Sequence, residues 1–99
     1  RQLDAGESTI KPLSTIAEKY GDQIEVMMDS GIRSGPDVAR AMASGAKFTF
    51  MGRSFMYGVS ALGKKGGDHT ISLLKAELQQ VMEQLCCEKT SDFPEHLIK

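Results

Sequence analysis

Two short apolar segments, each followed by a glycine and an arginine, constrain the fold of this chain more than any other feature. They are residues 24–28 with Gly31 and Arg33, and residues 47–51 with Gly52 and Arg53. Short apolar segments of this kind are typical of strands that are covered on both faces, as in parallel sheets. A helix-sized interval separates them, which predicts two parallel strands joined by a right-handed helical crossover.

Helical signals fill the chain around these segments. Capping residues, final glycines and apolar residues three and four positions apart predict the helices. The predicted ranges are Ser8 or Thr9 to about Tyr20, Pro36 to just before Gly45, Ser54 to about Leu62, and about His69 to Cys87 after a cap at Asp68. Residues 63–67 are expected to form a flexible break and residues 91–99 at most one short turn. The polar side chains expected to face water on the last helix are Lys75, Glu77, Gln80 and Glu83.

The order of these elements predicts an α/β fold that is part of a larger one. Two parallel strands with open edges and faces do not make a stable sheet alone. The 99 residues are therefore interpreted as a slice of a larger α/β protein. In a β/α barrel, ligands bind at the C-terminal ends of the strands, and phosphate is often held after the last two. The two glycine-arginine turns fit that position.

Both turns carry groups that bind phosphate. Glycine lets a backbone turn sharply and come close to a ligand, which is the role expected of Gly31 and Gly52. Arg33 and Arg53 would lie at the same end of neighbouring strands, beside a helix N-terminus. We interpret this set as a phosphate site. The alternative interpretation is two surface arginines that pair with nearby carboxylates.

Composition argues against several other functions. The net charge is −1, and the sequence has no basic stripe and no aromatic stacking platform, so no nucleic-acid partner is expected. No apolar run approaches the roughly 20 residues that span a membrane. Residues 1–4 lack the basic and then apolar pattern of a signal peptide. These observations favour a cytoplasmic location.

The cysteines and histidines give no sign of a metal or catalytic cluster. Cys86 and Cys87 are adjacent, and neighbouring positions on a helix point about 100° apart, so they are interpreted as free thiols in a reducing compartment. Their spacing does not suit a metal site, and no metal is expected. His69 and His96 lack the neighbours of a triad, and we expect both to be solvated.

Four stretches together resemble a known family. They are residues 29–38 (DSGIRSGPDV), residues 43–46 (ASGA), Gly52-Arg53, and the opening Arg1-Gln2-Leu3-Asp4. They are similar to the C-terminal part of the FMN-dependent 2-hydroxy acid dehydrogenases and oxidases, over essentially the whole chain. Residues 48–62 (FTFMGRSFMYGVSAL) look most like bacterial flavin-type L-lactate dehydrogenases. Other FMN barrels, such as type 2 isopentenyl diphosphate isomerase, carry similar turns, and the opening four residues favour the hydroxy acid enzymes.

The resemblance implies a fold and a set of site residues. The fold is the C-terminal segment of a TIM (β/α)8 barrel, with residues 1–99 forming its last quarter to third. The implied FMN-binding residues are Asp29, Ser30, Gly31 and Arg33 in the first turn, and Gly52 and Arg53 in the second. Asp29 has the alternative of an ordinary strand-end turn residue. Arg1 matches the arginine that binds the substrate carboxylate, where a bidentate guanidinium fixes the acid.

The implied activity belongs to a longer parent protein. That protein would use FMN to oxidise an L-2-hydroxy acid, with L-lactate as the expected substrate, to the 2-oxo acid. The family's histidine base would lie before Arg1, so the isolated chain is expected to be inactive. A homo-oligomer is expected, and peripheral association of the parent with the inner membrane is an alternative to a purely cytoplasmic location. The competing hypothesis is a non-catalytic segment that self-associates through its open strand edges.

Overall fold

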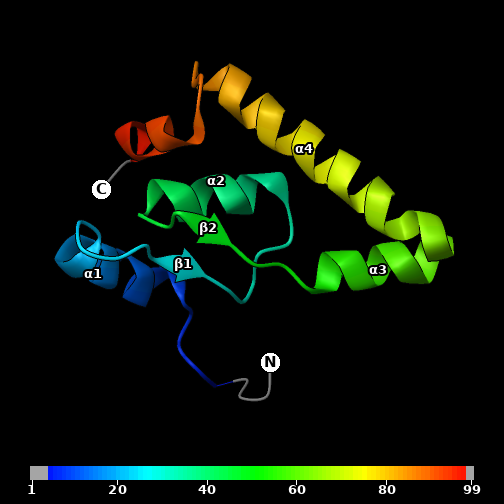
Figure 1. The fold of residues 1–99 in the computed structure, drawn as a ribbon, viewed down its shortest axis with the longest axis horizontal. Helices are drawn as coiled ribbons and strands as arrows, with labels where there is room; N and C mark the ends of the chain where they lie inside the picture. The colour runs from blue at the N-terminus through cyan, green and yellow to red at the C-terminus, as the bar shows by residue number, and fades with distance from the viewer. Residues whose placement is uncertain (1–4, 98–99) are drawn as a thin grey trace.

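The computed structural model describes residues 5–97, and two parallel strands lie at its centre with helices around them (Figure 1). The elements in chain order are α1 (Ile10–Tyr20), β1 (Met27–Met28), α2 (Gly35–Ala43), β2 (Phe48–Thr49), α3 (Arg53–Leu62), the 3₁₀ turn η1 (Gly63–Lys65), α4 (Gly66–Gln84) and the 3₁₀ helix η2 (Thr90–His96). β1 and β2 pair in parallel. The predicted pair of parallel strands with flanking helices is therefore confirmed.

The strands are short, and only one face of the sheet is covered. Met27 pairs with Phe48 and Met28 with Thr49, and the ladder extends through a hydrogen bond from the Phe50 N–H to the Met28 carbonyl of 2.9 Å. Val26 and Met28 are buried, whereas Met27 and Phe48 are 50% and 56% exposed. Side chains alternate between the faces of a strand. The expectation that both faces are covered is therefore wrong for the described part of the chain.

The covered face is held by α1 and α2. A cluster of buried apolar side chains joins them to the strands: Leu13, Val26, Met28, Ile32, Ala41 and Ala46. Ala41 is fully buried, which allows α2 to lie close to the sheet. Gly45, just past α2, has a φ of +117°, and a Cβ there would clash with the Cβ of Ala17. Only glycine satisfies both conditions, so the predicted helix end at Gly45 has a conformational and a steric cause.

The predicted break between α3 and α4 is nearly absent. Residues 63–65 form a 3₁₀ turn, and α4 begins at Gly66, so Asp68 lies in its first turn and is not its cap. Gly66 is buried against α3, and a Cβ on it would clash with the carbonyl of Gly58. The Thr70 hydroxyl donates to the Gly66 carbonyl at 2.8 Å. This close approach of two backbones fixes the start of α4, and it needs glycine on both helices.

The C-terminal part forms a second core that sequence reasoning missed. α4 ends at Gln84, earlier than the predicted Cys87, because Cys86 adopts a left-handed φ of +57°. The Cys87 N–H then donates to the Met82 carbonyl at 2.8 Å, which is the helix-ending bond of a Schellman turn. Cys87 packs with Ala39 of α2 and with Phe93 of η2, which is 1% exposed. Residues 90–96 are thus a packed helix rather than a loose tail.

The two cysteines differ in their surroundings. Cys86 is exposed and Cys87 is buried, and both are free thiols. Burial raises the pKa of the Cys87 thiol, and the nearby carboxylate of Asp92 raises it further. A raised pKa lowers the thiolate fraction at a given pH, so Cys87 is a packing residue rather than a nucleophile.

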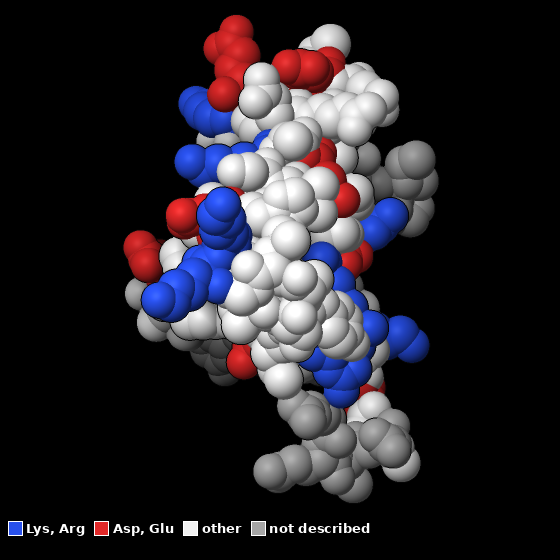
Figure 2. Space-filling model, turned by 90° about the vertical axis from the view of Figure 1, so that its right-hand side faces the viewer, with Lys and Arg blue, Asp and Glu red and all other residues white. Residues whose placement is uncertain are grey.

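Apolar side chains gather on the outer end of the molecule. The end face formed by α3 and the beginning of α4 shows a broad uncharged region flanked by basic residues (Figure 2). No residue of α3 is buried, and its exposed apolar side chains are Met56, Tyr57, Val59 and Leu62. The predicted helix is confirmed, but the chain itself does not cover this apolar face. Within residues 5–97, no helix is both long and apolar enough to cross a membrane.

Replacing Phe93 tests the second core. Phe93→Ala should lower the free energy of unfolding by about 3–5 kcal/mol, because it removes a fully buried ring and leaves a cavity. Phe48→Ala is the matched control, since that ring is 56% exposed and its loss should cost about 1 kcal/mol. Urea unfolding followed by far-ultraviolet circular dichroism measures both. Equal losses would contradict a packed η2.

Candidate functional site

The first turn follows β1 and is held by side-chain hydrogen bonds, one of them from the start of α1. The Asp29 carboxylate accepts a hydrogen bond from the Ser30 N–H at 2.7 Å, and the Thr9 hydroxyl donates to the Asp29 carbonyl at 3.2 Å. Ser30 and Gly31 have φ values of +81° and +82°. Two successive left-handed residues make a sharp turn, and the serine among them is strained by about 1–3 kcal/mol. The predicted turn at Gly31 is confirmed, and Asp29 takes part in it.

The backbone of Arg33 is bonded on both sides. Its N–H donates to the Asp37 carboxylate of α2 at 3.1 Å, and its carbonyl accepts from the Ser54 hydroxyl of α3 at 2.6 Å. The second of these bonds connects residues 21 positions apart. The two turns are therefore joined directly, and not only through the strands that precede them.

The second turn leads from β2 directly into α3. The Gly52 carbonyl accepts from the N–H groups of Phe55 and Met56, both at 3.1 Å, so Gly52 is the N-cap residue of α3. Its φ of −120° lies outside the left-handed region, so the backbone conformation at Gly52 does not by itself require glycine. A Cβ on Gly52 or on Gly31 would meet nothing within 4 Å. Both glycines thus leave open space beside the backbone.

The two arginines lie at one edge of the sheet without ion-pair partners. Arg33 is exposed and Arg53 is half-buried. Across residues 5–97, the one ion pair joins Arg40 to Asp37 at 3.1 Å. The alternative in which Arg33 and Arg53 pair with nearby carboxylates therefore finds no support in this part of the chain. The first N–H groups of α3 also lack intrahelical acceptors, so positive charge and free donors occur together.

Glu77 contributes to the site indirectly, which sequence reasoning missed. It was expected to face water, but it is half-buried, and its carboxylate accepts from the Gly35 N–H at 3.1 Å. Gly35 is buried, and a Cβ there would clash with the side chain of Glu77 and the backbone of α4. The signal that could have revealed Glu77 is the unsatisfied N–H at the start of every helix, which needs an acceptor. The contact fixes α2, and with it the Arg33 turn, on α4.

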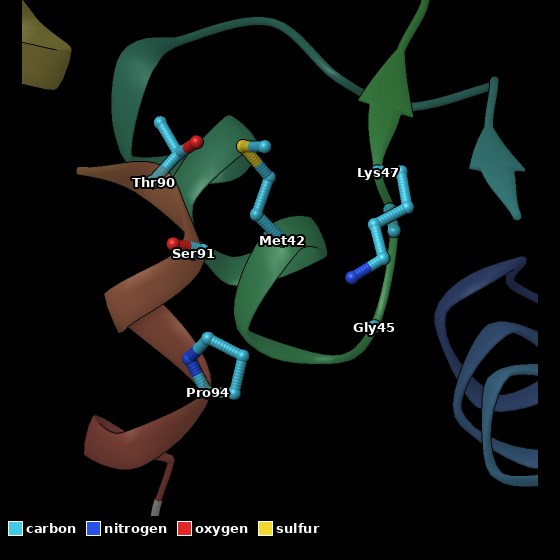
Figure 3. A pocket seen from close by; sticks show the side chains of 7 residues that line it. Met42, Gly45, Lys47, Thr90, Ser91 and Pro94 are labelled. Atoms are coloured by element: carbon cyan, nitrogen blue, oxygen red, sulfur yellow. The ribbon is translucent and has the colours of Figure 1, made fainter. Parts of the chain in front are cut away.

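Other cavities lie away from the two arginines. A hollow of about 340 Å³ between α1 and β1 reaches Asp29 and Ser30 of the first turn. A hollow of about 400 Å³ lies between α2, α4 and η2, and His96 is on its wall. A third, of about 140 Å³, lies between Lys47 and η2, and the Lys47 side chain extends into it (Figure 3). Neither Arg33 nor Arg53 lines any of these three.

One predicted site residue cannot be placed, and the two histidines, which were expected to be solvated, are exposed. Arg1 lies outside the described residues. His69 is exposed on α4, and His96 is exposed on η2. In the described ranges, no group of three or more histidine, cysteine, aspartate or glutamate side chains could hold a metal ion. The structure therefore brings together only the two turns, with Asp29, Ser30, Gly31 and Arg33 on one side and Gly52 and Arg53 on the other.

Comparison with known proteins identifies the family of this chain. A family model described as FMN-dependent dehydrogenase matches residues 1–99. The chain belongs to the FMN-dependent dehydrogenase family. The predicted membership is thus confirmed, and with it the cofactor, FMN.

Individual relatives of this FMN-dependent dehydrogenase segment are much longer proteins. An FMN-dependent alpha-hydroxy acid dehydrogenase of Schizosaccharomyces pombe is 40% identical over 79 residues, which are 80% of this chain and 19% of that protein. L-Lactate dehydrogenase of Alcaligenes faecalis is 37% identical over 98 residues, 99% of this chain and 26% of that protein. The chain therefore spans about a fifth to a quarter of these relatives.

Solved structures place the segment in a barrel. The structure of mandelate oxidase with benzoyl-formic acid matches with a TM-score of 0.87 and 35% identity, covering 94% of this chain and 28% of that one. The predicted fold class, an α/β segment of the TIM-barrel FMN-dependent dehydrogenases with two parallel strands and flanking helices, is confirmed.

Removing the Glu77 carboxylate tests its link to the site. Glu77→Ala should lower the free energy of unfolding by about 1–2 kcal/mol, because the N–H of the buried Gly35 loses a charged acceptor. Glu83→Ala on the same helix is the control; the hydrogen bond that its carboxylate accepts from Gln79 is exposed and should contribute about 0.5 kcal/mol or less. Urea titration monitored at 222 nm compares them. If the two variants lose the same amount, Glu77 is an ordinary surface residue.

Proposed function

We propose that this chain carries the FMN phosphate site of a 2-hydroxy acid oxidoreductase. Arg33 and Arg53 would hold the phosphate from two sides, and the N–H groups at the start of α3 would add donors. One observation carries the proposal: the two glycine-arginine turns leave neighbouring parallel strands at the same edge and are bonded to each other between Ser54 and Arg33.

The residues present fit a phosphate group. Two guanidinium groups without ion-pair partners among residues 5–97 offer a net positive charge at the sheet edge. The open space at Gly31 and Gly52 would let an anion approach the backbone. Asp29 is the one acidic side chain of the first turn, and one of its oxygens is already occupied by the Ser30 N–H. The arginines would offset its charge beside a phosphate.

Further roles are assigned to residues of the same edge and of the N-terminus. We infer that Asp29, exposed at the end of β1, accepts hydrogen bonds from the hydroxyls of the ribityl chain, and that Ser30 and Gly31 face the phosphate. Bound FMN supplies a flavin ring that accepts a hydride equivalent from the substrate. Arg1 would bind the substrate carboxylate through a bidentate contact. Residues 1–99 would form the last quarter to third of the barrel.

L-Lactate is the substrate we propose for the longer protein. The similarity to L-lactate dehydrogenase of Alcaligenes faecalis over 98 residues supports this choice, while the likeness to mandelate oxidase keeps larger 2-hydroxy acids as competitors. The chain's two histidines belong to α4 and η2 and not to either turn. We therefore propose that the base that removes the substrate proton comes from outside these 99 residues, and that the isolated chain is inactive.

Titrating the 99-residue chain with FMN in a calorimeter tests the site. We expect FMN to bind, inorganic phosphate to compete, and riboflavin, which lacks the phosphate, to bind far more weakly. The double variant Arg33→Ala/Arg53→Ala should bind about a hundredfold more weakly or worse, since each charge-assisted contact contributes about 1.5–3 kcal/mol. Lys64→Ala/Lys65→Ala, which removes two exposed charges in η1, should bind as the wild type does.

Two results would contradict the proposed site. Equal affinity of the wild type and the arginine variant would mean that FMN is held elsewhere. A folded chain that binds neither FMN nor inorganic phosphate would mean that these two turns are not a phosphate site. Circular dichroism of each variant before titration establishes that it is folded.

Dye reduction by a longer protein containing this segment tests the substrate. The kcat/KM for L-lactate should exceed those for glycolate and mandelate, and the D-enantiomer should be inactive. The 99-residue chain supplied with FMN should reduce no dye with L-lactate. A preference for mandelate would reject L-lactate while leaving the phosphate site untouched, because the substrate's side chain and the FMN phosphate are recognised by different groups.

A further inference from the structure

We propose that Ser54 is a positioning residue that sets the separation of Arg33 and Arg53, so that both guanidinium groups can reach one phosphate. This inference rests on the proposed phosphate site. Ser54 directly follows Arg53, and its hydroxyl donates to the carbonyl of Arg33 at 2.6 Å. One side chain therefore couples the backbone of one arginine to the backbone of the other.

The geometry of this bond is that of a strong contact. Hydroxyl–carbonyl bonds are most often 2.7–2.8 Å long, and 2.6 Å is at the short end of their range. The backbone of Arg33, whose carbonyl accepts this bond, is fixed at its N–H as well, because the N–H donates to the Asp37 carboxylate at 3.1 Å. Arg33 is thus bonded to the first turn of α2 and to the first turn of α3. Its backbone has little freedom to move relative to either helix.

The hydroxyl of Ser54 does not serve its own helix. A serine near a helix start usually accepts a hydrogen bond from a nearby N–H group of that helix. Here Gly52 is the cap residue of α3, and no side chain caps the helix. The Ser54 hydroxyl instead bonds across to the other turn, 21 residues earlier. An alanine at this position would leave the helix backbone unchanged and remove only the link between the turns.

The link opposes a specific repulsion. Arg33 and Arg53 are cations of the same sign on two turns that the Ser54 bond holds together, and neither has an ion-pair partner among the described residues. Like charges in the absence of an anion favour separation of the turns. The neutral hydrogen bond from the Ser54 hydroxyl to the Arg33 carbonyl resists that separation, and it occupies neither guanidinium. Both cations then remain available to a phosphate.

Calorimetric titration of the full 99-residue chain with FMN and with inorganic phosphate tests this role. Ser54→Ala should weaken both ligands about fivefold, the effect of losing one neutral hydrogen bond, whereas Ser54→Thr, which keeps a hydroxyl, should stay within about twofold of the wild type. Thr70→Val is the control for stability. It removes a buried hydroxyl–carbonyl bond to Gly66 on α4, outside both turns, and should lower the melting temperature without changing the dissociation constant of folded protein.

Each outcome decides between the two proposals. If Ser54→Ala binds like the wild type, or if Ser54→Thr is as weak as Ser54→Ala, the positioning role is rejected. In that case the phosphate site still stands if Arg33→Ala/Arg53→Ala loses binding. If the wild type binds no FMN, or if the arginine variant binds as well as the wild type, the phosphate site itself is rejected and the role of Ser54 with it.

Discussion

The parallel pairing of β1 with β2 is the constraint on which the rest of the structure depends. Because Met27 lies beside Phe48 and both strands run the same way, the turns that follow them emerge at one edge. Antiparallel pairing would place the two arginines at opposite ends of the sheet. The pairing itself is only two residues long, so helix contacts must maintain it. The buried face, where Val26 and Met28 meet α1 and α2, supplies those contacts.

Glycines determine how closely the helices approach one another. Gly35 lies against α4 at Glu77, and Gly66 lies against α3 at Gly58, with backbone contacts that no side chain would allow. Each contact places a helix start: α2 begins where Gly35 meets α4, and α4 begins where Gly66 meets α3. The Arg33 turn of the proposed phosphate site precedes α2, so the Gly35 contact also helps to set its position. Packing and site geometry therefore share one cause.

The sequence was informative where a local pattern has a single structural solution. The turn at Gly31 and the α2 start at Ser34 and Pro36 are of this kind, because φ and capping requirements act within a few residues. Long-range contacts were not visible. Glu77 has the pattern of a solvent-facing residue, and its acceptor role depends on Gly35, 42 positions earlier. Likewise, Phe93 is buried only because η2 folds back on α2.

The exposed apolar face of the sheet takes no part in the hydrogen bonds that hold the two turns. Phe48 and Phe50 lie edge to face on it, with ring centroids 5.2 Å apart, and both remain about half exposed. In the TIM barrels that this segment matches, further strands complete the sheet around such a face. The bonds that hold the two turns use none of these residues. The Ser54 hydroxyl joins one turn to the other, the Asp37 carboxylate accepts from the Arg33 N–H, and the Glu77 carboxylate accepts from the Gly35 N–H at the start of α2. The geometry of the proposed phosphate site is therefore built from the helix side of the sheet, and the exposed strand face takes no part in it.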